Sequence, residues 1–330
     1  MVQQCHNCGS EQMAFLYAAP GFDTTVQQSP VHYNILRCAQ CDMANTELLP
    51  GSSMNVEYSG EYYGSATGKF LGFIESFLLL AAGVRAKRIL RLWRRSTGDQ
   101  QSPSVLDIGC GRALLLRAFQ SMGATVLGLE RAEFPIADSN STFVCHGSLA
   151  DAEYASSQFD IVVLWHVLEH VEKQELLMDE ITRHLNPGGL LVLAVPNFAS
   201  LQQRLFTRNW FHLDLPRHLV HIKADWLTDR LCSSGYTIEG LHHIDLLQNT
   251  YGFIQSSMNR LVPRRQNAYY RFLKQGGSRS PAALVSFCGW SLLAAMLLPV
   301  AVFENFLSAI LGSGATIQVL ARRGEDSDQR

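Results

Sequence analysis

The chain has 330 residues, of which 17% are charged, and its formal net charge is −2 at pH 7. This length gives room for one catalytic domain and one or two attached segments. The nearly neutral charge argues against a general nucleic-acid-binding protein, whose domain would be strongly basic. The first residues do not combine a basic start with an apolar run and a cleavage site, so we expect no signal peptide.

Two Cys-x-x-Cys pairs lie near the N-terminus, one at Cys5 and Cys8 and the other at Cys38 and Cys41. Each pair can close a tight loop on one metal ion, and two pairs complete a tetrahedral site of four thiolates. Because four thiolates leave no open position for water, we interpret the site as structural zinc. Chance pairs or redox thiols are the alternatives, but the pairs lie outside any βαβ unit, which disfavours a thioredoxin-like role. We therefore expect a zinc ribbon over 1–50, with strands near 14–17 and 33–37.

Residues 51–102 are expected to form a helical, amphipathic linker region. Its segment 70–82 is almost wholly apolar, and six cations follow within eleven residues: Arg85, Lys87, Arg88, Arg91, Arg94 and Arg95. Apolar mass followed by clustered cations resembles a helix that lies on a membrane surface. The same pattern also suits a helix that packs on the core and has a solvated basic end.

The segment VLDIGCGR, at 105–112, combines an apolar strand with an acidic end and a glycine turn. Asp107 stands at the end of the strand, while Gly109 and Gly111 let the backbone turn tightly and approach a ligand. A second apolar strand, at 124–129, ends in Glu130, where a βαβ unit places a ribose-binding acid. The pattern predicts a nucleotide site.

Strands and helices alternate through the following residues. Further strands are expected at 142–146, 159–165, 190–195, 235–244 and 315–322, and helices at 113–120 and 173–185. An Asn-Pro-Gly-Gly turn precedes the strand at 190–195. This alternation is typical of an open, mostly parallel α/β sheet whose ligand lies outside the strand ends.

The segments VLDIGCG, GLE, FDIVVLWHVLEHV and LNPGGLLVLAVPN, in this order and at these distances, resemble the class I S-adenosylmethionine-dependent methyltransferases. The similarity is greatest to the branch typified by the ubiquinone-biosynthesis O-methyltransferases, and it covers about 103–245 with a tail at 315–322. It implies a Rossmann-like sheet of seven strands with helices on both faces. It also implies that Asp107, Gly109 and Gly111 hold the methionine end of S-adenosylmethionine and that Glu130 holds the ribose hydroxyls.

Two positions depart from the family pattern. Ala113 stands where the third glycine of the turn is usual, and Ser148 stands where an acid usually contacts the adenine. We assign Ser148 and Trp165, the last residue of the fourth expected strand, to the cofactor site. A dehydrogenase is the competing nucleotide-binding fold, but the turn lacks the longer G-x-G-x-x-G run, with Leu114 at the last glycine position.

Histidines mark the expected acceptor side. His166 directly follows the fourth strand, and the resemblance places it near the sulfonium as a candidate base or positioning group. The inverted zinc-protease motif H-x-x-E-H also matches here, but it would have to open straight off a strand of a nucleotide fold. In the segment 210–221, His218 is a second candidate base. The alternative is a structural corner in which Asp214 and Arg217 pair and His218 caps a helix.

The methyltransferase core is expected over 103–251, followed by a basic and hydrophobic helical insertion at 252–314 and a last strand and tail at 315–330. Residues 282–303 contain no charge, which is long enough for a transmembrane helix. Because the flanking strands belong to one sheet, we favour a re-entrant or interfacial hairpin that bends at Pro299 and returns through 306–311. A soluble helical lid or a dimer face is the alternative.

These features predict a cytoplasmic methyltransferase that is soluble or peripheral on the inner face of the cytoplasmic membrane. We expect O-methylation of a membrane-associated acceptor, such as a quinol or a lipid-linked glycan. Partners would be that acceptor, an anionic membrane surface and a second copy of the chain, with no nucleic acid. A zinc ribbon ahead of such a core also resembles enzymes of sugar and polysaccharide biosynthesis, so a soluble nucleotide sugar is an alternative acceptor. A different class of function is a non-catalytic scaffold with a vestigial cofactor site.

Overall fold

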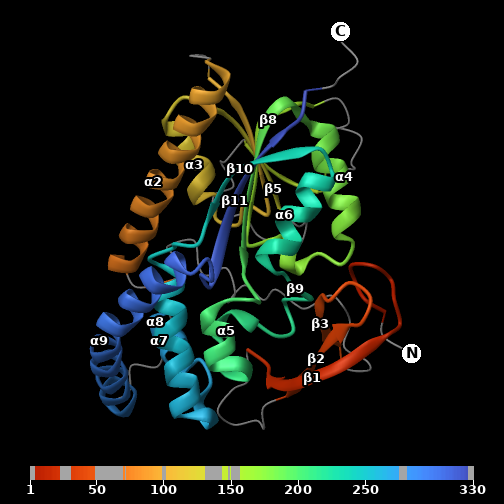
Figure 1. Cartoon of the computed structure of the whole chain (residues 1–330). Coiled ribbons are helices and arrows are strands. Elements are labelled where there is room, and N and C mark those ends of the chain that lie inside the picture. The colour runs from red at the N-terminus through yellow and green to blue at the C-terminus, as the bar shows by residue number, and fades with distance from the viewer. Residues whose placement is uncertain are drawn as a thin grey trace.

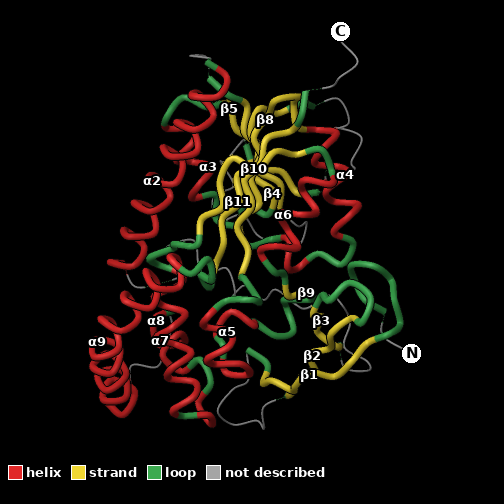
Figure 2. The backbone as a smooth tube through the Cα atoms, viewed as in Figure 1, coloured by secondary structure: helices red, strands yellow, loops and turns green. Residues whose placement is uncertain are grey.

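The computed structural model describes residues 4–22, 31–48, 70, 72–98, 102–130, 143–147, 149, 157–274 and 281–325. A sheet of seven strands and a smaller sheet of four strands organise this part of the chain (Figure 1). Helices lie on both sides of the larger sheet, and a separate group of helices lies beside its lower end in the view of Figure 2.

The seven-stranded sheet has the order β10-β11-β8-β7-β4-β5-β6. Strands β4 to β8 pair in parallel, whereas β11 is antiparallel to both of its neighbours, β8 and β10. This order confirms the expected doubly wound α/β sheet. Its strands are β4 Ser104–Ile108, β5 Thr125–Glu130, β6 Val144–His146, β7 Phe159–Trp165, β8 Leu185–Pro196, β10 Tyr236–His242 and β11 Thr316–Arg323.

Strand β7 shows why the sheet needs helices on both faces. Its residues from Ile161 to Leu164 are all buried, and a continuous apolar run is typical of a parallel strand covered on both sides. Ile161 and Val163 pack with apolar side chains of α2 (Gly72–Thr97) and α3 (Leu114–Ser121). Val162 and Leu164 point the other way, toward α4 (Gln174–His184) and α6 (Ala224–Ser233). The period-2 alternation of the strand thus divides the core into two layers.

Strand β8 begins earlier than expected. Leu185 already pairs with Phe159, and Leu190 pairs with Ile161, so the Asn-Pro-Gly-Gly segment bulges out opposite Asp160. The Asp160 carboxylate accepts hydrogen bonds from Asn186 at 2.9 Å and from the backbone of Ser104 at 2.8 Å. The turn is therefore held inside a continuous strand.

The smaller sheet has the order β1-β2-β3-β9 and is antiparallel throughout. Strands β1 (Met13–Pro20) and β2 (His32–Cys38) confirm the two ribbon strands expected there. Strands β3 (Ala44–Glu47) and β9 (Val220–His221) were not expected, and β9 comes from the core. The ribbon is thus joined through a shared sheet to the part of the chain that builds the larger sheet.

A helical body follows β10 and is made of α7 (Gln248–Leu261), α8 (Ala268–Leu273) and α9 (Pro281–Ile310), and the short α5 (Leu201–Phe206) packs beside α7 (Figure 1). The hairpin expected at Pro299 is wrong, because α9 continues through this proline as one helix of 30 residues. Pro299 is exposed, so the carbonyl that loses its backbone partner lies on the outer side of the helix. Within the described residues, Leu284–Ile310 is long and apolar enough to cross a membrane, with a hydropathy of 2.0.

Candidate active site

The turn after β4 depends on three residues with left-handed backbones. Gly109, Gly111 and Ala113 have φ angles of 67°, 52° and 56°. A Cβ atom at Gly109 would lie 2.6 Å from the side chain of Val167, so only glycine fits there. In the part of the chain that the structure describes, no atom lies within 4 Å of the same position at Gly111, which leaves the space beside the turn open. Ala113 adopts the backbone that glycine provides in the family pattern, at a small conformational cost.

Two buried carboxylates flank this turn at the carboxyl edge of the sheet. The backbone N–H of Gly111 donates to Glu130 at 2.6 Å. Burial and the negative charge of Glu130 raise the pKa of Asp107 to about 8. Two buried acids that repel each other are unfavourable for the protein alone, and a cationic ligand offsets that cost. S-adenosylmethionine carries a sulfonium and an ammonium group, so the residues present fit this cofactor.

Of the other two residues predicted to contact the cofactor, Trp165 and Ser148, the structure describes only Trp165. Trp165 ends β7, next to β4 in the sheet, and the Arg85 guanidinium lies 4.3 Å from the centre of its ring. Ser148 lies outside the described residues. The structure brings Asp107, Glu130 and Trp165 to one edge of the sheet, while their contact with a cofactor remains a prediction.

One contact at the turn was not predicted. Arg112 donates two hydrogen bonds to the Glu75 carboxylate, at 3.0 and 2.9 Å, and the pair is largely buried. It ties the first turn of α2 to the glycine turn. The only signal in the sequence is that Glu75 is the one acid in the apolar segment 70–82.

His166 is held by Glu169 just beyond the end of β7. Its Nδ1 lies 3.0 Å from the Glu169 carboxylate, and its buried Nε2 has no hydrogen-bond partner among the described residues. Burial raises the pKa of Glu169, but the hydrogen bond from His166 and nearby histidine charges outweigh it and hold the value at about 2. An ionised Glu169 accepts the Nδ1 proton, which leaves the lone pair of Nε2 free to take a proton.

His218 faces the same oxygen of this carboxylate. Its Nδ1 donates to the carbonyl oxygen of His212 at 2.9 Å, and its Nε2 lies 3.9 Å from Glu169 and 3.7 Å from Asp214. Burial lowers the pKa of His218 to about 4, so the ring is neutral near pH 7. The predicted pairing of Arg217 with Asp214 is confirmed, with one hydrogen bond at 3.1 Å. The structural and the catalytic interpretations of this segment are therefore compatible.

Glu169, His170 and His218 also form a group that could hold a cation. One ligand atom from each lies within 4.8 Å of the other two. The rings of His170 and His218 contact edge to face, with centroids 4.7 Å apart. An imidazole pair with one carboxylate is a donor set that divalent transition metals accept.

His212 was missed as a site residue. Burial, with the charges of His166 and His218, lowers its pKa to about 3, and its buried Nε2 has no hydrogen-bond partner. Gly252 of α7 makes room for it, since a Cβ atom there would lie 2.3 Å from that nitrogen. The signal was present, because His212 is one of three imidazoles in the segment 210–221.

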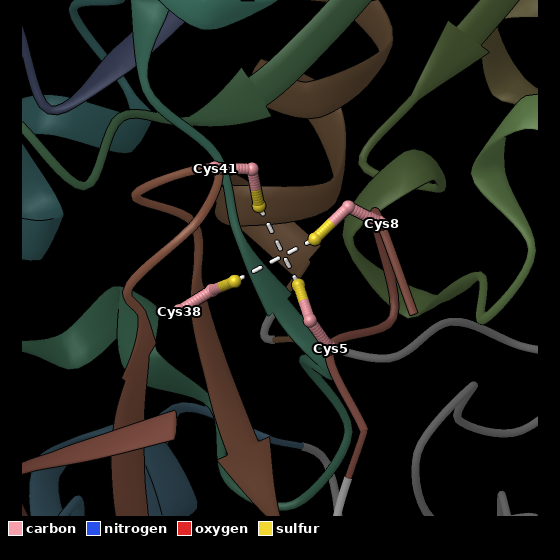
Figure 3. Close-up of side chains that lie close together, drawn as sticks. All are labelled: Cys5, Cys8, Cys38 and Cys41. Atoms are coloured by element: carbon pink, nitrogen blue, oxygen red, sulfur yellow. Dashed lines mark hydrogen bonds between the residues drawn. The ribbon is translucent and has the colours of Figure 1, made fainter. Parts of the chain in front are cut away.

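The four N-terminal cysteines converge on one point (Figure 3). Their sulfur atoms all lie within 4.8 Å of one another, and the Cys5–Cys41 and Cys8–Cys38 pairs are each 3.5 Å apart. Zinc–sulfur bonds of about 2.3 Å in a tetrahedron require similar sulfur–sulfur spacing. The four-cysteine cluster could therefore bind a structural zinc ion.

The ribbon contacts the histidine segment through β3. The Thr46 hydroxyl donates to the carbonyl oxygen of His218 at 2.6 Å, and its backbone N–H donates to Leu219 at 2.9 Å. The amide of Asn45, one residue earlier, lies 3.6 Å from the Cys5 sulfur. A short hydrogen-bonded path therefore leads from the metal site to the backbone of His218.

Replacing Cys5 and Cys8 together by serine is expected to remove about one equivalent of zinc and to lower the melting temperature, because metal binding stabilises the folded ribbon. Metal analysis and calorimetry measure both effects. Amide exchange at Val220 and His221 should also become faster, since β9 pairs with the ribbon. The exposed Cys232 and Cys288 provide the matched double control. A purified protein without metal, equally stable in both forms, would contradict the assignment.

The raised pKa of Asp107 makes the stability of the ligand-free protein depend on pH. A carboxyl whose folded pKa lies above its ordinary value of 3.8 stabilises the fold at low pH, and this contribution is lost as pH rises toward about 8. Asp107→Asn removes this titration. From pH 5 to pH 8 the free energy of unfolding of the variant should therefore rise relative to that of the wild type by on the order of 4 kcal/mol. Urea unfolding at both values tests this. A difference between the two proteins that does not change with pH would refute it.

Comparison with known proteins adds independent information. Residues 80–241 match the family described as Methyltransferase domain. A ubiquinone biosynthesis O-methyltransferase of Rhizobium etli is 31% identical over 147 residues, which cover 40% of this chain and 58% of that protein. The protein of the same name from Brucella ovis is 35% identical over 169 residues, 47% of this chain and 66% of that protein. The chain thus spans less than two thirds of the length of these relatives.

Solved structures were also compared. A SAM-dependent methyltransferase from Archaeoglobus fulgidus gives a TM-score of 0.43 at 19% identity, covering 74% of this chain and 94% of that one. Coclaurine N-methyltransferase, bound to N-methylheliamine and SAH, gives a TM-score of 0.43 at 16% identity, covering 72% and 70%. From its strand order, its glycine turn and the match over residues 80–241, the chain belongs to the class I S-adenosylmethionine-dependent methyltransferases.

Proposed function

We propose that this protein transfers the methyl group of S-adenosylmethionine to an oxygen atom of an acceptor. The observation that carries the proposal is the pair of buried carboxylates beside an open glycine turn. When bound, the cofactor supplies an electrophilic methyl group, so the protein has to align donor and acceptor and remove one proton. Asp107, Gly109 and Gly111 would hold the methionine end, Glu130 the ribose, and Trp165 and Ser148 the adenine side.

His166 is the better candidate for the base. Its Nδ1 is bonded to Glu169 while its Nε2 is unpartnered, which is the arrangement of an oriented imidazole base. Both nitrogens of His218 instead face protein groups. His218 would then shape the pocket beside Glu169 without removing the proton.

The acceptor is proposed to be membrane-associated, such as a quinol or a lipid-linked glycan. The relatives named ubiquinone biosynthesis O-methyltransferase support a lipophilic acceptor, and so do the outward apolar side chains of α2 and α9. A soluble nucleotide sugar or polysaccharide precursor is the second candidate, favoured by the four-cysteine cluster ahead of the core. The enzyme would work in the cytoplasm, at the inner face of the cytoplasmic membrane, as a monomer or a homodimer.

Calorimetry with S-adenosylmethionine tests the cofactor. The wild type should bind it, and Glu130→Ala should weaken binding at least tenfold, because the ribose hydroxyls and the Gly111 N–H lose their acceptor. Glu175→Ala, which removes an exposed carboxylate from α4, is the control and should bind like the wild type. Absence of binding, or binding that Glu130→Ala leaves unchanged, would support a non-catalytic scaffold.

Methyl transfer tests the base and the acceptor class together. Labelled S-adenosylmethionine is supplied with a bacterial lipid extract or with a mixture of nucleotide sugars, and the labelled fraction is identified. His166→Asn should lower the rate about 100-fold or more with cofactor affinity within twofold of wild type. His218→Asn should lower it less than tenfold. The reverse order of the two effects would assign the base to His218.

A further inference from the structure

The C-terminal part of helix α9 has polar residues on its buried side and apolar residues on its exposed side. In its last three turns the buried residues are Ala301 and three polar residues, while the exposed side chains are large and apolar. Glu304 and Asn305 face the protein, whereas Phe303 and Ile310 are 66% and 83% exposed. A surface helix in water normally has the opposite arrangement, with its apolar stripe toward the core.

Glu304 and Asn305 each accept a hydrogen bond inside the protein. Gln202 of α5 donates to the Glu304 carboxylate at 2.7 Å, and Asn249 of α7 donates to Asn305 at 3.0 Å. These contacts fix the rotation of the helix, so its apolar side cannot turn inward. Only 11% of the most apolar window of α9 is buried. The exposed apolar side chains form a face along the whole helix: Val285, Leu292, Met296, Val300, Phe303, Phe306 and Ile310.

The segment from α7 through most of α9 carries only positive charge. Residues 246–303 include five arginines and one lysine but no acidic residue. Arg260, Arg264 and Arg265 are exposed at the far end of α7, next to the exposed Leu261. Cations beside an apolar face are complementary to a membrane that contains anionic lipid.

The first half of α2 extends the apolar surface. Phe77, Leu80 and Val84 are exposed, while the second half of the same helix packs on the sheet. The start of α2 lies against the helical body, because Phe70 forms a bridge with Lys274 and its ring contacts Tyr270. Two segments far apart in the sequence therefore contribute to one side of the molecule.

We propose that the outer face of α9 and the first half of α2 are embedded in the surface of a bilayer containing anionic lipid. The helix would lie in the plane of the membrane, because α7 and α8 contact it on its other side and β11 follows directly after it. Its apolar side chains then enter the acyl region, and Arg264 and Arg265 meet the phosphate groups. This inference concerns a surface and does not depend on methyl transfer, although it would bring a lipophilic acceptor close to the enzyme.

Vesicle flotation of the full chain tests the proposal. The wild type should float with vesicles of phosphatidylcholine and phosphatidylglycerol, and less with phosphatidylcholine alone. The triple change Leu292→Glu, Met296→Glu and Phe303→Glu should reduce flotation at least tenfold, since these side chains are exposed and need no repacking. Arg264→Gln with Arg265→Gln should remove the preference for anionic lipid.

Leu176→Glu is the matched control, because Leu176 is an exposed leucine of α4, outside the proposed face. It should float like the wild type. A wild type that stays in the soluble fraction, or a triple variant that still floats, overturns the proposal. The proposal is also overturned if the wild type is a dimer that does not bind vesicles and the triple variant is a monomer. A second copy of the chain would then cover the face. S-adenosylmethionine binding, measured on the same variants, shows that they are folded and reports separately on the proposed function.

Discussion

The parallel pairing of β4 with β5 and β7 is the constraint on which the site depends. It brings the carboxyl ends of three strands to one edge, so that Asp107, Glu130 and Trp165 become neighbours although 58 residues separate the first from the last. The charges at this edge follow from the same constraint. Carboxylates forced together in a buried place are poor for stability, and they are useful only if a ligand of opposite charge is present.

A second layer of organisation surrounds Glu169. This one carboxylate faces His166 and His218, and its backbone carbonyl accepts the N–H of Leu219. Leu219 also accepts from Thr46 of the ribbon. The segment that carries His218 is therefore held between the core and the cysteine cluster, which gives the ribbon a structural role in the site whether or not it has another role.

Much of the fold could be predicted because its signals are local. The run FDIVVLW is buried over its interior and forms β7 with the expected bounds, and the cysteine pairs cluster as their spacing indicates. The failures involve distant partners. β9 has two residues, and its partner β3 lies more than 170 positions away, so no periodicity marks either. The prediction of a hairpin at Pro299 was wrong because a long helix can contain an exposed proline. The carbonyl four residues earlier, which loses its hydrogen bond, then lies on the outer side of the helix. The pairing of Glu75 with Arg112 likewise cannot be predicted from the residues next to Glu75 in the sequence.

The position of β11 has a consequence for how the chain is assembled. This strand sits between β8 and β10, yet it is synthesised after the whole helical body. Until residues 316–323 emerge, the edge of β8 stays unpaired and β10 has no place in the sheet. The most apolar helix of the chain is thus exposed to its surroundings before the sheet closes, during the interval in which long-range strand pairing is slow and aggregation competes. Closure of the sheet therefore has to wait for the last strand, which is made after the helical body.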